Sequence, residues 1–347
     1  MQFGIFAPTP GVTVGSAESA QAIAEALSPL PAGRQDAQYD LNVSVLQAAD
    51  ELGFDLVLFA ERHLGSDFSA WLLAGAVGPR LNRMLSLVAV HPGLWDPVMV
   101  GKLVVSLDRM CKGRVALNVV NGWFDEEFRM FGGTVLQGEP RYRRTVEFID
   151  ILRGLWSNDT FSYDGEFYKL DKGRLLLRPA SPTLPEIYSV SASDRGRDFI
   201  AEHCDWWFVE MPKTTQTTDE TLRGIEANIA DMDRRLRRTG RKVRYAINPF
   251  VALGKNQDEA LAATMQQIFA FDQGQDRRKI ESRMLPATKA GMIGSPDAVL
   301  RQLRRFESLG VELVLCKLVP TVDNLRHIAE ELIVPMRGAS SSLPMAS

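Results

Sequence analysis

The stretch that decides the fold spans residues 85–133, LSLVAVHPGLWDPVMVGKLVVSLDRMCKGRVALNVVNGWFDEEFRMFGG. Two apolar runs rich in valine and leucine, residues 85–90 and 114–120, are typical of strands buried on both faces. Between them, residues 96–109 carry apolar side chains at helical spacing and begin with Asp96-Pro97, which predicts an N-cap and a first-turn proline. The order strand, helix, strand predicts a βαβ unit with parallel strands.

The rest of the chain repeats this alternation. Further strands are expected at residues 3–6, 55–59, 185–190, 206–209, 243–253 and 310–318, with a hairpin over 160–170. Further helices are expected at residues 40–52, 68–81, 142–156, 194–203, 219–238, 258–271, 295–309 and 322–334. A doubly wound sheet shows the same alternation, but no GxGxxG follows an early strand and the length suits a (β/α)₈ TIM barrel with insertions.

We expect one domain over residues 1–337 and a disordered tail over 338–347. Residues 11–37 form a long connection, in which residues 17–27 are rich in Ala, Glu and Leu and favour a helix. Residues 273–289 form a charged insertion that we expect to be irregular, and a lid is expected near residues 273–291.

The composition is that of an ordinary globular protein, with 45% hydrophobic and 24% charged residues among 347 and a formal net charge of -3. This charge gives no reason to expect a nucleic-acid or membrane partner, and no apolar run has the length of a membrane span. Cys111, Cys204 and Cys316 are far apart and form no CxxC pair, which favours a reducing compartment, and we expect a cytoplasmic protein. No cluster of potential ligands has the spacing of a metal site.

Sites in parallel α/β folds form at the carboxyl ends of strands, so the residues there are the candidates for chemistry. His63 and His91 follow the second and third strands, where each is either a general acid/base or a packed loop histidine. Asn118, inside the fourth strand, either contacts a ligand or bonds to a neighbour in the barrel. Phe6, Trp95 and Trp123 lie at strand ends, where they either wall a pocket for a planar cofactor or belong to the core.

Two further segments are candidates for binding an anion. Ser191-Ala192-Ser193 precedes a helix, where small residues admit a phosphate to the helix N-terminus or simply cap it. Tyr142 lies in an arginine-rich helix start, which either holds a phosphate or forms a basic face paired with Glu139 and Glu147. Arg277 and Arg278, in the insertion, either close over an anionic ligand or are solvated.

Several long segments resemble the bacterial luciferase-like, flavin-dependent monooxygenases. They are PGLWDPVMVGKLVVSLDRMCKGRVALNVVNGWFDEEFRMFGG, RYRRTVEFIDILRGLW, FSYDGEFYKL and GSPDAVLRQLRRFESLGVELVL. The resemblance is to the two-component branch, the dimethylsulfone, alkanesulfonate and pyrimidine monooxygenases. It implies a TIM barrel, a homodimer or homotetramer, and an enzyme that uses O₂ and reduced FMN (FMNH2) from a separate NAD(P)H-dependent flavin reductase.

The resemblance also implies roles for individual residues. Asn118 contacts the isoalloxazine, and we assign Phe59 and Val90, the last residues of their strands, to the same cofactor. Tyr142 and Ser191-Ala192-Ser193 hold the phosphate, although the family commonly has Gly-Gly-Ser-Ser at this turn. Arg277 and Arg278 belong to a mobile lid. Glu61-Arg62-His63 resembles the Glu-His-His segment of the luciferases, and His63 then matches their catalytic histidine.

The expected reaction is oxidation of a small organic substrate with cleavage of a C–S or C–N bond, as in the dimethylsulfone and alkanesulfonate enzymes. Because Glu61-Arg62-His63 is more luciferase-like, a nitrogen heterocycle or riboflavin itself stays open as the substrate. Two other functions also stay open: a deazaflavin-dependent dehydrogenase on the same barrel, and a flavin-binding protein without catalytic activity.

Overall fold

The computed structural model of the chain describes residues 1–8, 33, 36–63, 67–121, 124–180, 183–212, 217–271 and 277–338, with the backbone alone at 269–271, 277–279 and 283. The helix expected over residues 17–27, Trp123 and the tail after Gly338 lie outside these residues.

Eight parallel strands close into a barrel, as the sequence predicts. In chain order they are β1 (Gln2–Phe6), β2 (Leu56–Phe59), β3 (Leu85–Val90), β4 (Val115–Val119), β7 (Ile187–Val190), β8 (Trp206–Phe208), β9 (Arg244–Ile247) and β12 (Val311–Cys316). Their order around the barrel is β1-β12-β9-β8-β7-β4-β3-β2, so β1 closes the barrel by pairing with both β12 and β2.

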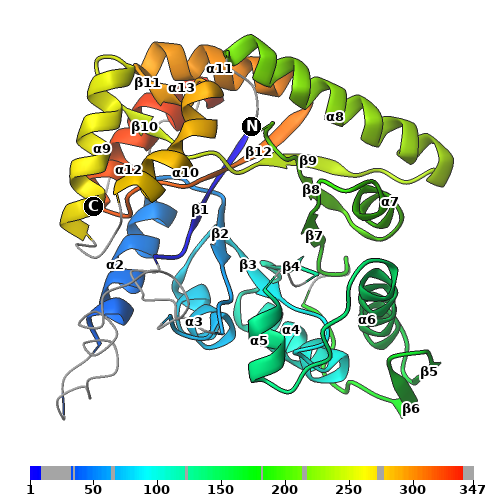
Figure 1. Cartoon of the computed structure of the whole chain (residues 1–347). Helices are drawn as coiled ribbons and strands as arrows, with labels where there is room; N and C mark the ends of the chain where they lie inside the picture. The colour runs from blue at the N-terminus through cyan, green and yellow to red at the C-terminus, as the bar shows by residue number, and fades with distance from the viewer. Residues whose placement is uncertain are drawn as a thin grey trace.

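Helices form an outer layer around these strands (Figure 1). They are α2 (Ala37–Glu51), α3 (Ala70–Val77), the 3₁₀ turn η1 (Gly78–Arg80), α4 (Pro97–Met110), α5 (Asp125–Met130), α6 (Glu139–Ser157), α7 (Asp194–His203), α8 (Thr218–Thr239), α9 (Gln257–Phe271), α10 (Arg277–Lys289), α11 (Pro296–Ser308), α12 (Val322–Ile328), the π-helical turn η2 (Ala329–Ile333) and α13 (Val334–Arg337). Asp96 caps α4 by accepting the N–H groups of Val98 and Met99, as its Asp-Pro sequence predicts. None of the helices among the described residues has both the length and the apolar character of a membrane span.

Outside the barrel, β5 (Phe161–Asp164) and β6 (Lys169–Gly173) form the expected antiparallel hairpin. The single strand expected over residues 243–253 is wrong, because β9 ends at Ile247 and residues 252–253 form β10 (Ala252–Leu253) in a separate sheet. There β10 pairs in parallel with β11 (Ile293–Gly294). Pro249 lies at the break, where it has no N–H to donate to a ladder; its carbonyl instead accepts the N–H of Lys317.

Two other predictions are also corrected. The irregular structure expected over residues 273–289 is largely the helix α10, because Ile280, Met284 and Ala287 recur at helical spacing and are all buried. The residues after the fourth strand, where no helix is expected, form the short helix α5, with three acidic residues in its first turn, where the helix dipole favours negative charge.

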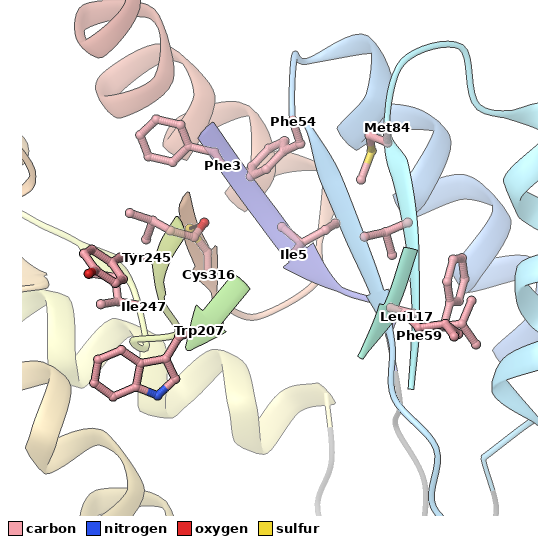
Figure 2. Close-up of a cluster of buried hydrophobic side chains, with 14 of the residues drawn as sticks. Phe3, Ile5, Phe54, Phe59, Met84, Leu117, Trp207, Tyr245, Ile247 and Cys316 are labelled. Atoms are coloured by element: carbon pink, nitrogen blue, oxygen red, sulfur yellow. Dashed lines mark hydrogen bonds between the residues drawn. The ribbon is translucent and has the colours of Figure 1, made fainter. Parts of the chain in front are cut away.

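The core has two apolar layers, one on each face of the barrel wall, because strand side chains alternate between the two faces. The lumen is filled by a buried cluster of Leu56, Leu58, Leu87, Ala116, Tyr188, Trp206, Phe208, Ala246, Leu313 and Leu315. The outer layer fills the space between strands and helices and includes Phe3, Ile5, Phe59, Leu117 and Trp207 (Figure 2). A packed lumen leaves the carboxyl ends of the strands, here called the rim, as the place for a site.

Candidate active site

At one side of the rim, rings from three segments gather around His63; this group, here called the histidine pocket, consists of His63, His91, Trp71, Trp95 and Phe131. His63 follows β2, and its ring centroid lies 5.6 Å from that of His91 after β3, 6.4 Å from Trp95 and 5.0 Å from Phe131. Trp71, on α3, packs 6.1 Å from Trp95. The structure thus brings together two histidines and a tryptophan that the sequence placed at separate strand ends.

Polar atoms in the histidine pocket are buried without a hydrogen-bond partner among the described residues. They are His63 Nε2, His91 Nδ1, Trp71 Nε1 and Trp95 Nε1. Buried polar atoms are nearly always hydrogen-bonded in folded proteins, and leaving one unpaired costs about 1–3 kcal/mol. Four such atoms in one pocket are typical of a site whose partner is a ligand or water.

Burial shifts the pKa values of the titratable groups in this pocket. It lowers the pKa of His63 and lowers that of His91 to about 4, so both imidazoles are largely neutral at pH 7. Burial also raises the pKa of Glu61 to about 7, because only the N–H of Ala70 offsets the desolvation of its carboxylate. Glu61 Oε1 lies 3.8 Å from His63 Nδ1, so a carboxyl group whose pKa is raised and an imidazole whose pKa is lowered lie side by side.

On β4, Asn118 faces the barrel lumen, since it lies two residues after Ala116 of the lumen cluster. Its side chain is buried and its Oδ1 has no hydrogen-bond partner in the part of the chain that the structure describes. Of the two alternatives left open by the sequence, this geometry favours a ligand contact for that oxygen.

Further along the rim, three hydroxyl groups converge after β7; this group, here called the serine seat, consists of Tyr142, Ser191 and Ser193. Tyr142 Oη lies 3.4 Å from Ser191 Oγ and 3.1 Å from Ser193 Oγ, and the two serine oxygens are 3.2 Å apart. Ser193 is the N-cap of α7 and accepts the N–H of Gly196. Burial opposes ionisation of the Tyr142 phenol, but hydrogen bonds with the two serines and the charge of Arg141 outweigh it and lower its pKa.

Positive charge surrounds the serine seat. The guanidinium groups of Arg141 and Arg195 lie 5.6 Å and 5.8 Å from the centre of the Tyr142 ring. Arg195 also forms a two-bonded ion pair with Glu139, at 2.5 Å and 2.8 Å, so part of its charge is compensated. Hydroxyl groups, guanidinium groups and a helix N-terminus together are a suitable environment for a phosphate.

The serine seat depends on a glycine in the first turn of α7. A Cβ at Gly196 would lie 1.9 Å from Ser191 Oγ and 2.7 Å from Tyr142 Oη. No side chain fits there, so only glycine permits the three hydroxyl groups to converge.

Next to the serine seat lies a cavity of about 320 Å³ at the carboxyl ends of β7, β8, β9 and β12, here called the rim cavity. Its lining comprises Val190, Ala192, Phe208, Val209, Glu210, Met211, Asn248, Phe250, Pro286, Ala287 and Lys317. Most of these groups are apolar, with one ammonium group, one carboxylate and one amide among them, which is the usual character of a small-molecule site.

The other residues that the sequence predicts for the site lie outside the histidine pocket and the serine seat. The side chains of Phe59 and Val90 point into the outer apolar layer, so only their backbone faces the rim. Phe6 lies at the end of β1, with the Lys317 ammonium 5.9 Å from its ring centre. Ala192 lines the rim cavity. The side chains of Arg277 and Arg278 are not among the described atoms, although both residues belong to α10.

Sequence reasoning did not identify several residues of the site. Trp71, Glu127, Gly196 and Lys317 all lie in or beside it, and Glu61, which the sequence marks only through its likeness to the luciferase segment, lies beside His63. Lys317 directly follows β12 and Glu61 lies two residues after β2, and the sequence does indicate such positions. Trp71, Glu127 and Gly196 lie on helices, where an acidic, aromatic or glycine residue has no distinguishing local pattern.

Comparison with known proteins identifies the same family that the sequence segments resemble, over nearly the whole chain. Residues 1–313 match the model of the family described as luciferase-like monooxygenase. The chain is 28% identical over 338 residues to an FMNH(2)-dependent dimethylsulfone monooxygenase of Pseudomonas fluorescens (strain Pf0-1), covering 88% of this chain and 89% of that protein. A protein of the same name from Pseudomonas putida is 26% identical over 327 residues, covering 86% and 88%.

Among solved structures, monooxygenase RslO1 from Streptomyces bottropensis superposes with a TM-score of 0.73 at 17% identity, over 97% of this chain and all of that one, which shows the shared fold. The protein belongs to the luciferase-like monooxygenase family.

Proposed function

We propose that this protein is the oxygenase of a two-component system, which takes reduced FMN from a separate NAD(P)H-dependent reductase and uses O₂ to oxidise a small organic substrate. Family membership and the names of its relatives support the cofactor and the reductase. The proposed reaction is cleavage of a C–S or C–N bond, as the name dimethylsulfone monooxygenase suggests for the relatives. The observation that carries the proposal is the serine seat beside the rim cavity.

The residues present fit FMN in three respects. The serine seat offers hydroxyl donors, nearby guanidinium groups and a helix N-terminus to a phosphate, and Gly196 keeps it open. Asn118 Oδ1, buried and unpaired among the described residues, suits an N–H of the isoalloxazine. The apolar rim cavity, adjacent to the seat at Ala192, offers room for a ring system or a substrate. When bound, reduced FMN supplies the electrons that activate O₂.

The histidine pocket would hold and move the proton that such a reaction requires. His63 is largely neutral at pH 7, and its buried Nε2 is available to accept or donate a proton. Glu61, at 3.8 Å from Nδ1, can exchange a proton with the same ring because its pKa is about 7. The buried Trp71 and the partly buried Trp95, which pack against each other, shield this side of the rim from water.

The position of helix α10 beside the rim cavity supports our proposal that this segment is a lid. Its residues Pro286 and Ala287 form part of the cavity wall, so a movement of this helix would open or close the cavity. Arg277 and Arg278, at its N-terminal end, belong to the same proposed lid.

Oxygen uptake tests the proposal. The purified protein is supplied with FMN, NADH and a flavin reductase, and oxygen consumption is measured while sulfones, sulfonates and nitrogen heterocycles are added in turn. Substrate-dependent uptake with formation of an oxidised product is expected. Hydride transfer to a deazaflavin without oxygen consumption would contradict the proposal and favour a dehydrogenase instead.

A further inference from the structure

Glu127 links two loops of the rim that are far apart in sequence. It lies on α5, after β4, and the residue is only 3% exposed. Its Oε1 accepts the backbone N–H of His63 at 3.0 Å and Nε of Arg62 at 3.4 Å. A buried carboxylate that binds a backbone N–H fixes that stretch of backbone, because the hydrogen bond is charge-assisted and shielded from water.

The charge of Glu127 also acts on the imidazole that it positions. Burial and the positive charge of Arg62 oppose protonation of His63, whereas Glu127 favours it. The other titratable groups around this ring are Glu61 on its own loop and His91 from the loop after β3, with Asp67 next to Glu61. Glu127 is the one among them whose carboxylate bonds directly to the His63 backbone in the described part of the chain.

We propose that Glu127 is a positioning residue, which holds the His63 backbone in place from α5 and supplies a negative charge close to His63. The inference rests on the proposed function only in giving His63 a part in proton transfer. The contact itself depends on no cofactor, so it can be tested separately.

Three variants separate position from charge. Glu127→Gln keeps an oxygen that accepts the His63 N–H but removes the charge, and Glu127→Ala removes both. Glu126→Gln removes the same charge from the neighbouring, exposed position of α5 and is the matched control. The chain has four histidines, so each ring can be assigned and followed by NMR through a pH titration of the full-length protein without added flavin.

We expect the pKa of His63 to fall in Glu127→Gln and to stay at the wild-type value in Glu126→Gln. In the oxygenase assay, the limb of the pH profile that His63 governs should move to lower pH in Glu127→Gln. Glu127→Ala should also lower kcat by up to about 100-fold, as expected when a catalytic group is displaced by about an ångström.

An unchanged His63 pKa in Glu127→Gln, or an equal change in Glu126→Gln, would overturn the inference. A lowered pKa in a protein that shows no oxygenase activity with any flavin would instead support the inference while contradicting the proposed function. The two failures are therefore distinguishable.

Discussion

At the residue scale, the candidate site depends on side chains at the carboxyl ends of buried strands and on a few residues that hold those side chains in place. His63, His91 and Asn118 were predictable because each lies at the carboxyl end of a buried run, and parallel strands bring those ends to one rim. Glu127 was not predictable, because its bond to His63 joins residues 64 positions apart and depends on how α5 packs. The role of Gly196 likewise appears only when Tyr142 and Ser191 are placed beside it.

Replacing His63 tests the proton-transfer role. His63→Ala should lower product formation by about 100-fold or more, the usual contribution of a general acid/base, and should release more hydrogen peroxide per reduced FMN consumed. His327→Ala, at an exposed position on α12, is the control and should leave both quantities unchanged. Full coupling of oxygen uptake to product in His63→Ala would show that the assignment of His63 is wrong.

Replacing Gly196 tests the serine seat. The Cβ of Gly196→Ala would displace Ser191 Oγ, and loss of a charge-assisted hydrogen bond to the phosphate should raise the dissociation constant of FMN by about 10- to 100-fold. Gly75→Ala, on α3, is the matched control, since a Cβ there meets no atom within 4 Å. Equal FMN affinity in the two variants, measured by flavin fluorescence or absorbance, would exclude the serine seat as the phosphate site.

At the element scale, periodicity predicted most helices and strands, and its failures have local causes. The helix α10 was missed because charged residues dominate its first half, although Ile280, Met284 and Ala287 form a buried stripe. The strand expected over residues 243–253 is too long because it joins two apolar runs that Pro249 separates in the structure. A buried carboxylate also joins two elements: Asp50, near the end of α2, accepts the N–H groups of Asn82, Arg83 and Met84, which directly precede β3.

The Asp50 contact predicts a loss of stability. Asp50→Asn replaces two accepting oxygens by one oxygen and one NH₂ group, so at least one of the three backbone N–H groups then faces a donor. Because the site is buried, this should lower the free energy of unfolding by about 2–4 kcal/mol. Glu51→Gln, the exposed neighbour on the same helix, should change it by less than about 0.5 kcal/mol. Urea unfolding followed by circular dichroism measures both; similar midpoints for the two variants would contradict this account of the contact.

At the scale of the whole molecule, the repeated alternation of strands and helices predicts the barrel. The sequence does not show that Glu61 and His91 are buried with shifted pKa values. Between pH 4.5 and 7 the native state keeps the proton of Glu61 and the unfolded state loses it, so this group makes stability fall as pH rises. Between pH 4 and 6.5 the unfolded state binds a proton at His91 that the native state does not, so that group makes stability rise with pH.

These two opposing contributions can be separated by substitution. Relative to the wild-type protein, Glu61→Gln should gain about 3 kcal/mol in free energy of unfolding from pH 4.5 to 7, and His91→Gln should lose a similar amount from pH 4 to 6.5. The wild-type protein should lie between them. Urea unfolding midpoints between pH 4 and 7 measure how the stability of each variant depends on pH. Parallel curves of stability against pH for the two variants would contradict the burial of Glu61 and His91 in their neutral forms.

We propose above that the rim binds reduced FMN delivered by another protein. Anaerobic titration of the protein with reduced and with oxidised FMN tests it most directly. We expect tight binding of the reduced form and weaker binding of the oxidised form, with both weakened in Gly196→Ala. Binding of neither form would contradict it and would leave a deazaflavin as the cofactor to test next.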